Sequence, residues 1–310
     1  MKDEKFLTGV ILTFLSAVTF SAKAIFVKLA YKYDIDPTSL ICLRLLFSVP
    51  FFIVILIYSW RSKHPRLSVK DHLWLIAVAI FGFYLSVFLD FWGLLYLSAG
   101  LERIILFSYP AMVVLMTRLF FKERISRRAF IALLITYLGI VISYIDEVSV
   151  NGANQFKGVV LILACSLFYA GYMVASQSII SKIGSLRFTA YVMIVATGAG
   201  LIHQTLVKPL QFGGYPSEVY RIALTMAIVS TVIPTLLLSE GIKRVGASRA
   251  AIINTIGPIA TIYLAHVYLG EDITALQLVG GALVVIGVVF LSQRRKIAKI
   301  VASRPEHSTI

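Results

Sequence analysis

The chain has 310 residues, of which 59% are hydrophobic and 14% are charged, and its mean hydropathy is +0.88. These values exclude an ordinary soluble globular domain and indicate a membrane protein with several spanning helices. The loops between the apolar segments are too short to fold by themselves. We therefore expect one membrane domain without a separate soluble module.

The net charge of +14 would suit a nucleic-acid-binding protein, but the basic residues are spread over alternate loops. If the N-terminus is cytoplasmic, twenty Lys and Arg residues lie in cytoplasmic loops or tails, and only five lie on the opposite side. These five are Lys32, Arg103, Lys157, Lys208 and Arg221. This positive-inside distribution predicts that both termini are cytoplasmic and that nucleic acid is not a partner.

Ten apolar segments come close to or exceed the roughly 20 residues that a transmembrane helix needs. In chain order they are residues 7–29, 38–60, 73–97, 101–121, 129–146, 158–181, 188–207, 219–241, 248–269 and 273–293. We therefore predict an all-α polytopic membrane protein with ten transmembrane helices.

Two stretches of the chain repeat one another. Ala99–Val141 aligns with Ala247–Val289 without a gap at an offset of 148 residues, and eight of the 43 paired positions are identical. Each stretch has a proline, then an acidic residue, then a glycine in the same order. We therefore expect two five-helix repeats, residues 1–148 and 156–293, followed by a basic cytoplasmic tail, residues 294–310. Because five is odd, the second repeat must be inverted in the membrane, an arrangement typical of secondary transporters.

Three prolines, Pro110, Pro234 and Pro258, fall inside predicted spans. Proline lacks an N–H and clashes with the carbonyl four residues earlier, so it bends a helix. A carbonyl freed in hydrocarbon needs another partner. The matching places of Pro110 and Pro258 in the repeats favour bent helices that face a central site, and a packed kink without a ligand is the alternative.

Three ionisable residues lie in the outer half of predicted spans: Lys23 in the first, Arg44 in the second and Asp90 in the third. A charge at this depth costs about 2.5–3.5 kcal/mol on insertion scales, so each one needs a partner or a role. We predict that Asp90 pairs with Lys23 or Arg44. Such a cluster could bind a zwitterion, and Asp90 could exchange a proton with it. The alternatives are a static ion pair between helices and, for the two cations, snorkelling towards the headgroups.

Other candidates carry less charge or lie nearer the span ends. Arg118 and Glu240, near the cytoplasmic ends of the fourth and eighth spans, are a hypothetical gating pair. The uncharged substrate-binding candidates are Tyr84, Trp92, Tyr109, Tyr172, Gln177, Asn254 and Thr255. Trp92 would also suit the aromatic belt at the membrane interface, and polar stripes often only join helix to helix. We predict neither a metal site nor a cofactor.

Several of these motifs resemble a known family, the EamA-type, ten-helix branch of the drug/metabolite transporter superfamily. The resemblance rests on Ser108-Tyr109-Pro110, Phe120 to Ile125 and Gly139, and on their counterparts Gly257-Pro258, Leu269 to Ile273 and Gly287. It covers nearly the whole chain and implies a carrier that works by alternating access. The four-helix multidrug members have a glutamate in their first span, and this chain has none there. The proton-coupling site of those four-helix members is therefore not assigned to this chain.

The resulting expectation is a secondary active transporter in the cytoplasmic (inner) membrane that exports an amino acid or related zwitterionic metabolite. Proton coupling is a further hypothesis. The alternative is uptake or exchange of another metabolite, such as a nucleotide-like or cationic compound. An intramembrane enzyme is disfavoured because the spans hold neither paired aspartates nor a zinc-binding helix. A receptor without transport activity is the other rival. The expected partners are a small-molecule substrate, membrane lipids and, if transport is coupled, protons.

Overall fold

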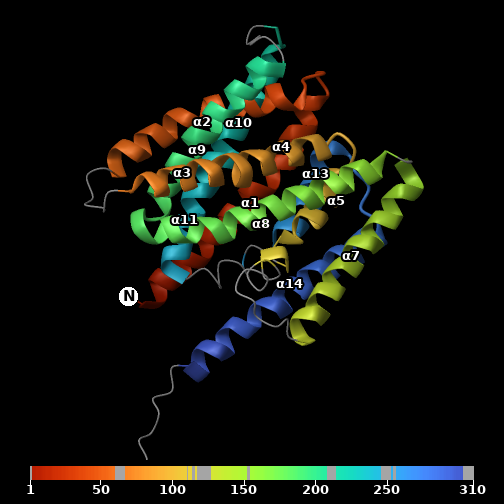
Figure 1. Ribbon diagram of the computed structural model, residues 1–310. Helices are drawn as coiled ribbons and strands as arrows, with labels where there is room; N and C mark the ends of the chain where they lie inside the picture. Colours follow the sequence, from red (N-terminus) through yellow and green to blue (C-terminus); the bar gives the residue numbers. More distant parts are fainter. Residues whose placement is uncertain are drawn as a thin grey trace, which may run out of the picture.

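The computed structural model describes residues 2–59, 67–109, 111–113, 116, 127–151, 154–207, 214–245, 253 and 256–302. Within these ranges all regular secondary structure is helical (Figure 1). This agrees with the predicted all-α fold.

Six helical segments in the described part of the chain are long and apolar enough to cross a membrane. They belong to α1 (Lys2–Tyr31), α2 (Pro37–Ser59), α3–η1–α4 (Val69–Ala77, Val78–Tyr84 and Leu85–Gly93), α8 (Gln155–Ile183), α9 (Ser185–Val207) and α10–η2–α11 (Ser217–Ala227, Ile228–Val232 and Ile233–Val245). Large apolar side chains cover their outward faces, as hydrocarbon requires. Val54, Phe81 and Ile202, for example, are 65%, 63% and 63% exposed.

The other described helices are α5 (Ala99–Leu106), α7 (Arg127–Asn151), α13 (Gly257–Leu269) and α14 (Ala275–Ala302). The last three contain shorter apolar stretches. Two predicted spans, residues 101–121 and 248–269, extend beyond the described ranges, so the count of ten helices remains a prediction. Helix α14 continues to Ala302, so the first part of the predicted basic tail is helical.

Helix α1 runs through the middle of the bundle (Figure 1) and packs against α5, α10, α11 and α13. Two serine side chains fix it to the second half of the chain. Ser16 Oγ donates a hydrogen bond to the carbonyl oxygen of Pro234 at 2.7 Å. Ser21 Oγ donates to the carbonyl oxygen of Gly257 at 3.0 Å. The part of α1 that precedes Lys23 is therefore held against α11 and α13 of the second half.

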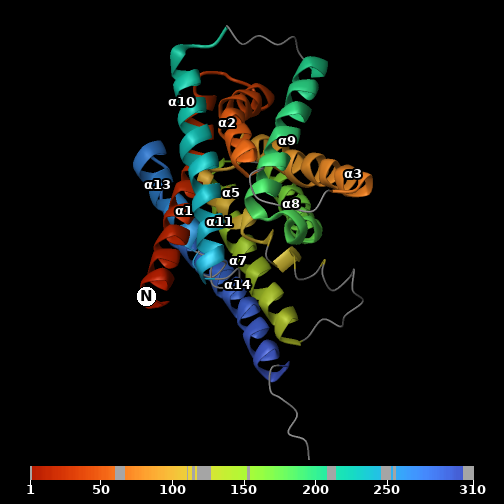
Figure 2. The ribbon, with the colours of Figure 1, turned by 90° about the vertical axis from the view of Figure 1, so that its left-hand side faces the viewer.

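Helices α7 and α14 lie side by side and extend away from the rest of the bundle (Figures 1 and 2). Glycines bring their backbones together. A Cβ atom added at Gly139 would lie 2.5 Å from the carbonyl oxygen of Gly280, which is too close for any larger residue. Small residues permit such approach between membrane helices. The glycines that mark the repeated sequence therefore join these two helices.

Two of the long helices contain a π-helical segment. The segments are η1 (Val78–Tyr84), between α3 and α4, and η2 (Ile228–Val232), between α10 and α11. Shifting η1 by the 148-residue repeat offset places it on residues 226–232, a range that contains all of η2. Bulges of this kind bend helices and are frequent at functional sites.

The three prolines differ in their surroundings. Pro234 lies two residues after the end of η2, in the first turn of α11, and the bend expected there stays a prediction. Pro258 lies in the first turn of α13, a position where its missing N–H leaves no intrahelical bond unmade. Residues 254 and 255 of the turn before it lie outside the described residues, so the bend expected at Pro258 stays a prediction. Pro110 lies outside the described residues.

Candidate functional site

A buried ion cluster joins three helices. Lys23 of α1 lies 2.5 Å (Nζ to Oδ2) from Asp90 of α4 and 3.4 Å (Nζ to Oε1) from Glu102 of α5. Asp90 and Glu102 are 3% and 0% exposed. Of the two partners predicted for Asp90, the structure gives Lys23. Because these charges lie inside a membrane bundle, the lysine must offset the cost of burying both carboxylates.

Glu102 was not singled out as a candidate from the sequence. It lies in the first turn of α5, which begins after Ser98, whose hydroxyl accepts a hydrogen bond from the N–H of Leu101 at 3.1 Å. A carboxylate is favourable at the positive end of a helix. The signal that could have revealed Glu102 is an acidic residue four positions after a capping serine, at the start of an apolar run.

Arg103 is a correction to the predicted loop charges, because it lies on α5 and not in a loop. Its guanidinium lies over Gly257, where an added Cβ would be 3.2 Å from Nη2. It is close enough to interact electrostatically with Lys23, Asp90 and Glu102. Its Nε is buried and has no hydrogen-bond partner among the described residues.

Arg44, the other predicted partner of Asp90, is 4% exposed. Its guanidinium carbon lies 5.2 Å from the centre of the Phe91 ring, a cation–π contact. It interacts with Asp90 electrostatically but without an ion-pair contact.

Several buried polar atoms in this region have no hydrogen-bond partner among the described residues. They are Asp90 Oδ1, Glu102 Oε2, Arg44 Nε and Arg103 Nε. A buried polar atom without a partner is costly, so unsatisfied groups that gather in one place indicate a binding site for water or a ligand.

A row of aromatic rings begins at Phe107, which lies with Arg103 over Gly257 and meets Tyr109 with ring centres 5.9 Å apart. Tyr109 meets Tyr169 edge to face with ring centres 5.1 Å apart, and Tyr169 stacks on Tyr172 at 5.7 Å. The row continues to Phe83 of η1 and Phe188 of α9. It thus brings together two of the predicted substrate-binding residues, Tyr109 and Tyr172.

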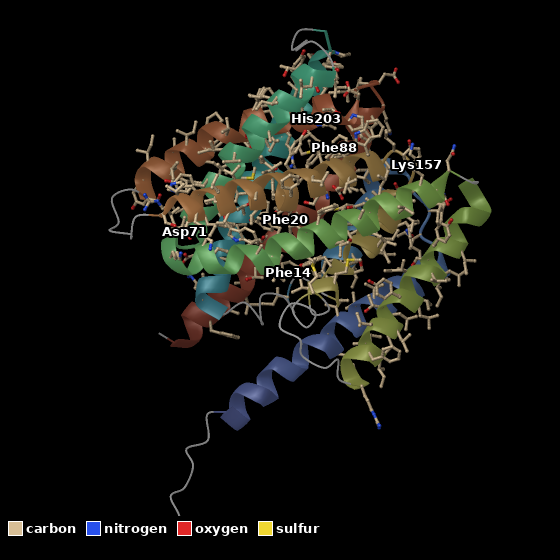
Figure 3. The ribbon with its side chains drawn as sticks, in the orientation of Figure 1. Phe14, Phe20, Asp71, Phe88, Lys157 and His203 are labelled. Carbon is tan, nitrogen blue, oxygen red and sulfur yellow. The ribbon has the colours of Figure 1, made fainter. Side chains whose placement is uncertain are left out.

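The other two predicted aromatic candidates, Tyr84 and Trp92, belong to a separate cluster around His203 of α9. Tyr84 Oη lies 2.8 Å from His203 Nδ1, and the Phe88 ring centre lies 5.1 Å from that of His203. Trp92 packs on Phe88. Figure 3 shows the labelled Phe88 and His203 side chains together between α4 and α9.

Of the remaining candidates, the structure describes only the Glu240 side chain. Glu240 forms an ion pair with Arg244 on its own helix at 2.9 Å. Arg118, Asn254, Thr255 and the side chain of Gln177 lie outside the described residues. In the searched, described part of the chain, no group of three or more His, Cys, Asp and Glu residues is arranged to hold a metal ion.

Known proteins share this fold and sequence. The family model described as the EamA-like transporter family matches residues 7–145 and again residues 156–293. An uncharacterized transporter of Bacillus subtilis, YcbK, is 37% identical over 280 residues, covering 88% of each chain. An uncharacterized transporter of Archaeoglobus fulgidus is 26% identical over 269 residues, covering 86% of this chain and 93% of its own.

A protein of known crystal structure covers 97% of this chain and 99% of its own at 17% identity, with a TM-score of 0.63, and supports the fold. The family matches confirm the resemblance predicted from the motifs. The chain belongs to the EamA-like transporter family, whose relatives above are membrane transporters of uncharacterized specificity.

Proposed function

We propose that the protein is a secondary active transporter that exports an amino acid or related zwitterionic metabolite across the cytoplasmic membrane by alternating access. The observation that carries this proposal is the contact of Lys23 with both Asp90 and Glu102 inside the bundle. Ionisable groups at membrane depth mark substrate or ion pathways by default.

The cluster offers both kinds of partner that a zwitterion needs. A substrate ammonium can replace Lys23 Nζ at one of the two carboxylates, and a substrate carboxylate can pair with a cation. The ion pair that closes the empty site would then be exchanged for ion pairs with the substrate. Each exchange leaves no charge without a partner, which lowers the cost of moving charged groups through the membrane interior.

Proton coupling follows as a second part of the proposal. Of the described cations, Lys23 alone forms ion pairs with the two carboxylates, and Glu102 Oε2 has no hydrogen-bond partner among the described residues. Two neighbouring carboxylates readily share one proton. Release of that proton when a substrate ammonium arrives would link substrate export to proton entry.

The test is flux in liposomes containing the purified full-length protein. Counterflow of labelled L-amino acids should fall at least about tenfold in Asp90→Asn, because a charged hydrogen bond of roughly 1.5–3 kcal/mol is lost. Asp71→Asn is a matched control, since Asp71 forms an ion pair with the half-exposed Lys182 at the edge of the molecule (Figure 3). Counterflow that is unchanged in Asp90→Asn for every transported zwitterion would rule out this site.

The second candidate is uptake or exchange of a cationic compound. It is favoured by Asp90 Oδ1 and Glu102 Oε2, two carboxylate oxygens without partners among the described residues. Flux of amines without flux of amino acids would favour this candidate. Comparing flux in vesicles that hold the protein in opposite orientations would give the direction of net transport.

A further inference from the structure

We infer that Arg103 binds a carboxylate of the transported substrate, so that the substrate class is a carboxylic acid and not a simple amine. This inference rests on the transport function proposed above and specifies one contact within it. No carboxylate was assigned to Arg103 by sequence reasoning, which placed this residue in a loop.

Among the described residues, the ion pairs of the cluster involve only Lys23 and leave two cations, Arg44 and Arg103, without an acid. Asp90 and Glu102 share Lys23, at 2.5 Å and 3.4 Å. No ion pair joins Arg103 to any acidic residue in the ranges the structure describes, although it interacts electrostatically with both acids. Among the residues that the structure describes, the cluster thus contains three cations, Lys23, Arg44 and Arg103, and two acids, Asp90 and Glu102.

Arg44 is a poorer carboxylate ligand than Arg103. It is 4% exposed, and the face of its guanidinium is occupied by the Phe91 ring. Arg103 is only half-buried, and it lies over Gly257, which has no side chain to cover it. A guanidinium presents paired N–H donors that match the two oxygens of a carboxylate.

The surroundings of Arg103 fit the rest of such a substrate. The nearby carboxylates of Asp90 and Glu102 can receive an ammonium group. Phe107 lies with Arg103 over Gly257 and meets Tyr109 edge to face, so the aromatic row begins beside Arg103. An amino acid held by Arg103 at its carboxylate and by Asp90 or Glu102 at its ammonium would place its side chain near these rings.

The experiment compares free acids with their amides. Thermal stability of the purified full-length protein is measured with each proteinogenic L-amino acid and with its α-carboxamide, at constant pH and ionic strength. We expect at least one free acid to raise the Tm while its amide does not. In Arg103→Gln the apparent affinity for that acid should fall at least about tenfold, and Arg103→Lys should retain part of it.

Arg221→Gln is the matched control, because Arg221 is 71% exposed and pairs with Glu218 on its own helix. Three results would overturn the inference: amides that act as strongly as acids, an acid effect that survives in both Arg103 variants, or no free acid that acts. If Arg103→Gln does not fold, the wild-type comparison of acids with amides still tests whether a carboxylate is recognised, and Arg103→Lys tests the role of Arg103.

Flux separates this inference from the transport function. Transport of an amine by protein that does not distinguish acids from amides would remove the carboxylate contact and leave a carrier. Binding of an acid through Arg103 without any flux in liposomes would keep the contact and remove the transport proposal.

Discussion

Glu271, in the loop between α13 and α14, accepts a hydrogen bond from the backbone N–H of Ala99 at 2.9 Å. Its second carboxylate oxygen accepts one from the N–H of Gly100 at 3.3 Å. These two donors belong to the free N–H groups at the start of α5, which carries Glu102 and Arg103. A residue from the C-terminal half of the chain therefore positions the helix that supplies two charges of the ion cluster.

Replacement of Glu271 by Ala should lower stability by about 1–2 kcal/mol, since two N–H groups would lose a charged acceptor. The change is measured as a lower Tm of the purified protein. Asp272→Ala is the control, because Asp272 is the exposed neighbour of Glu271. If both variants had the same Tm as the wild type, the hydrogen bonds of Glu271 to the start of α5 would contribute nothing measurable to stability.

The ion cluster predicts an unequal response to removal of its two sides. Lys23→Met leaves two buried carboxylates without their shared cation, whereas Asp90→Asn leaves Lys23 paired with Glu102. Removing one side of a buried pair costs about 3–5 kcal/mol. We therefore expect Lys23→Met to have a lower Tm than Asp90→Asn.

The stability of Lys23→Met should also rise as the pH falls, because protonation removes the two uncompensated charges in the folded protein. A Lys23→Met variant that melts above Asp90→Asn, or one that becomes less stable in acid, would contradict this account of the cluster.

Sequence patterns predicted the long helices well because each is set by its own apolar residues. The segment 38–60 corresponds to α2, Pro37–Ser59, and the segment 188–207 lies within α9. The pairing of Lys23 with Asp90 was also predictable, since the two opposite charges stand at similar inferred depth in an otherwise apolar setting. Local composition suffices for such features.

The features that were missed depend on contacts between distant residues. Glu102 meets a lysine 79 positions away, and the local sequence gives no sign of that contact. The aromatic candidates divide into two groups because Tyr84 turns to His203, while Tyr172 turns to Tyr169. The π-helical segments change the helix period by too little to appear in a hydropathy pattern.

The close contact between α7 and α14 predicts that a glycine-to-alanine substitution there is destabilising, whereas helix propensity alone predicts the opposite. Alanine favours a helix over glycine by about 1 kcal/mol. At Gly198 of α9 no atom lies within 4 Å of an added Cβ, so Gly198→Ala should be neutral or stabilising. At Gly139 the added Cβ would lie 2.5 Å from the carbonyl oxygen of Gly280, so Gly139→Ala should be destabilising. Opposite changes in Tm are expected, and equal ones would contradict close packing at Gly139.

The proposed proton coupling predicts a specific loss in Glu102→Gln. Wild-type transport in liposomes should respond to an imposed pH gradient, whereas Glu102→Gln should retain exchange of substrate and lose that response. Glu218→Gln changes an exposed acid of α10 and serves as the control. A pH-gradient response that persists in Glu102→Gln would exclude Glu102 as the coupling group.

The π-helical segments η1 and η2 occupy matching places in the two repeats. We therefore predict that replacing Pro234, next to η2, raises the stability of the protein and slows its transport. Pro234 has no N–H to donate to the carbonyl of Ser230, four residues earlier. Neighbouring threonine hydroxyls bond to other carbonyls of this helix: Thr231 Oγ1 to that of Met226 at 3.3 Å, and Thr235 Oγ1 to that of Thr231 at 2.6 Å. Pro234→Ala restores an N–H, so this helix can become regular.

If the bend at Pro234 takes part in alternating access, Pro234→Ala should have a higher Tm and slower counterflow than the wild type. Pro216→Ala, at the start of α10, is the control. Because a purely structural bend would leave the rate unchanged, a stabilised variant with wild-type counterflow would show that η2 is not part of the transport movement.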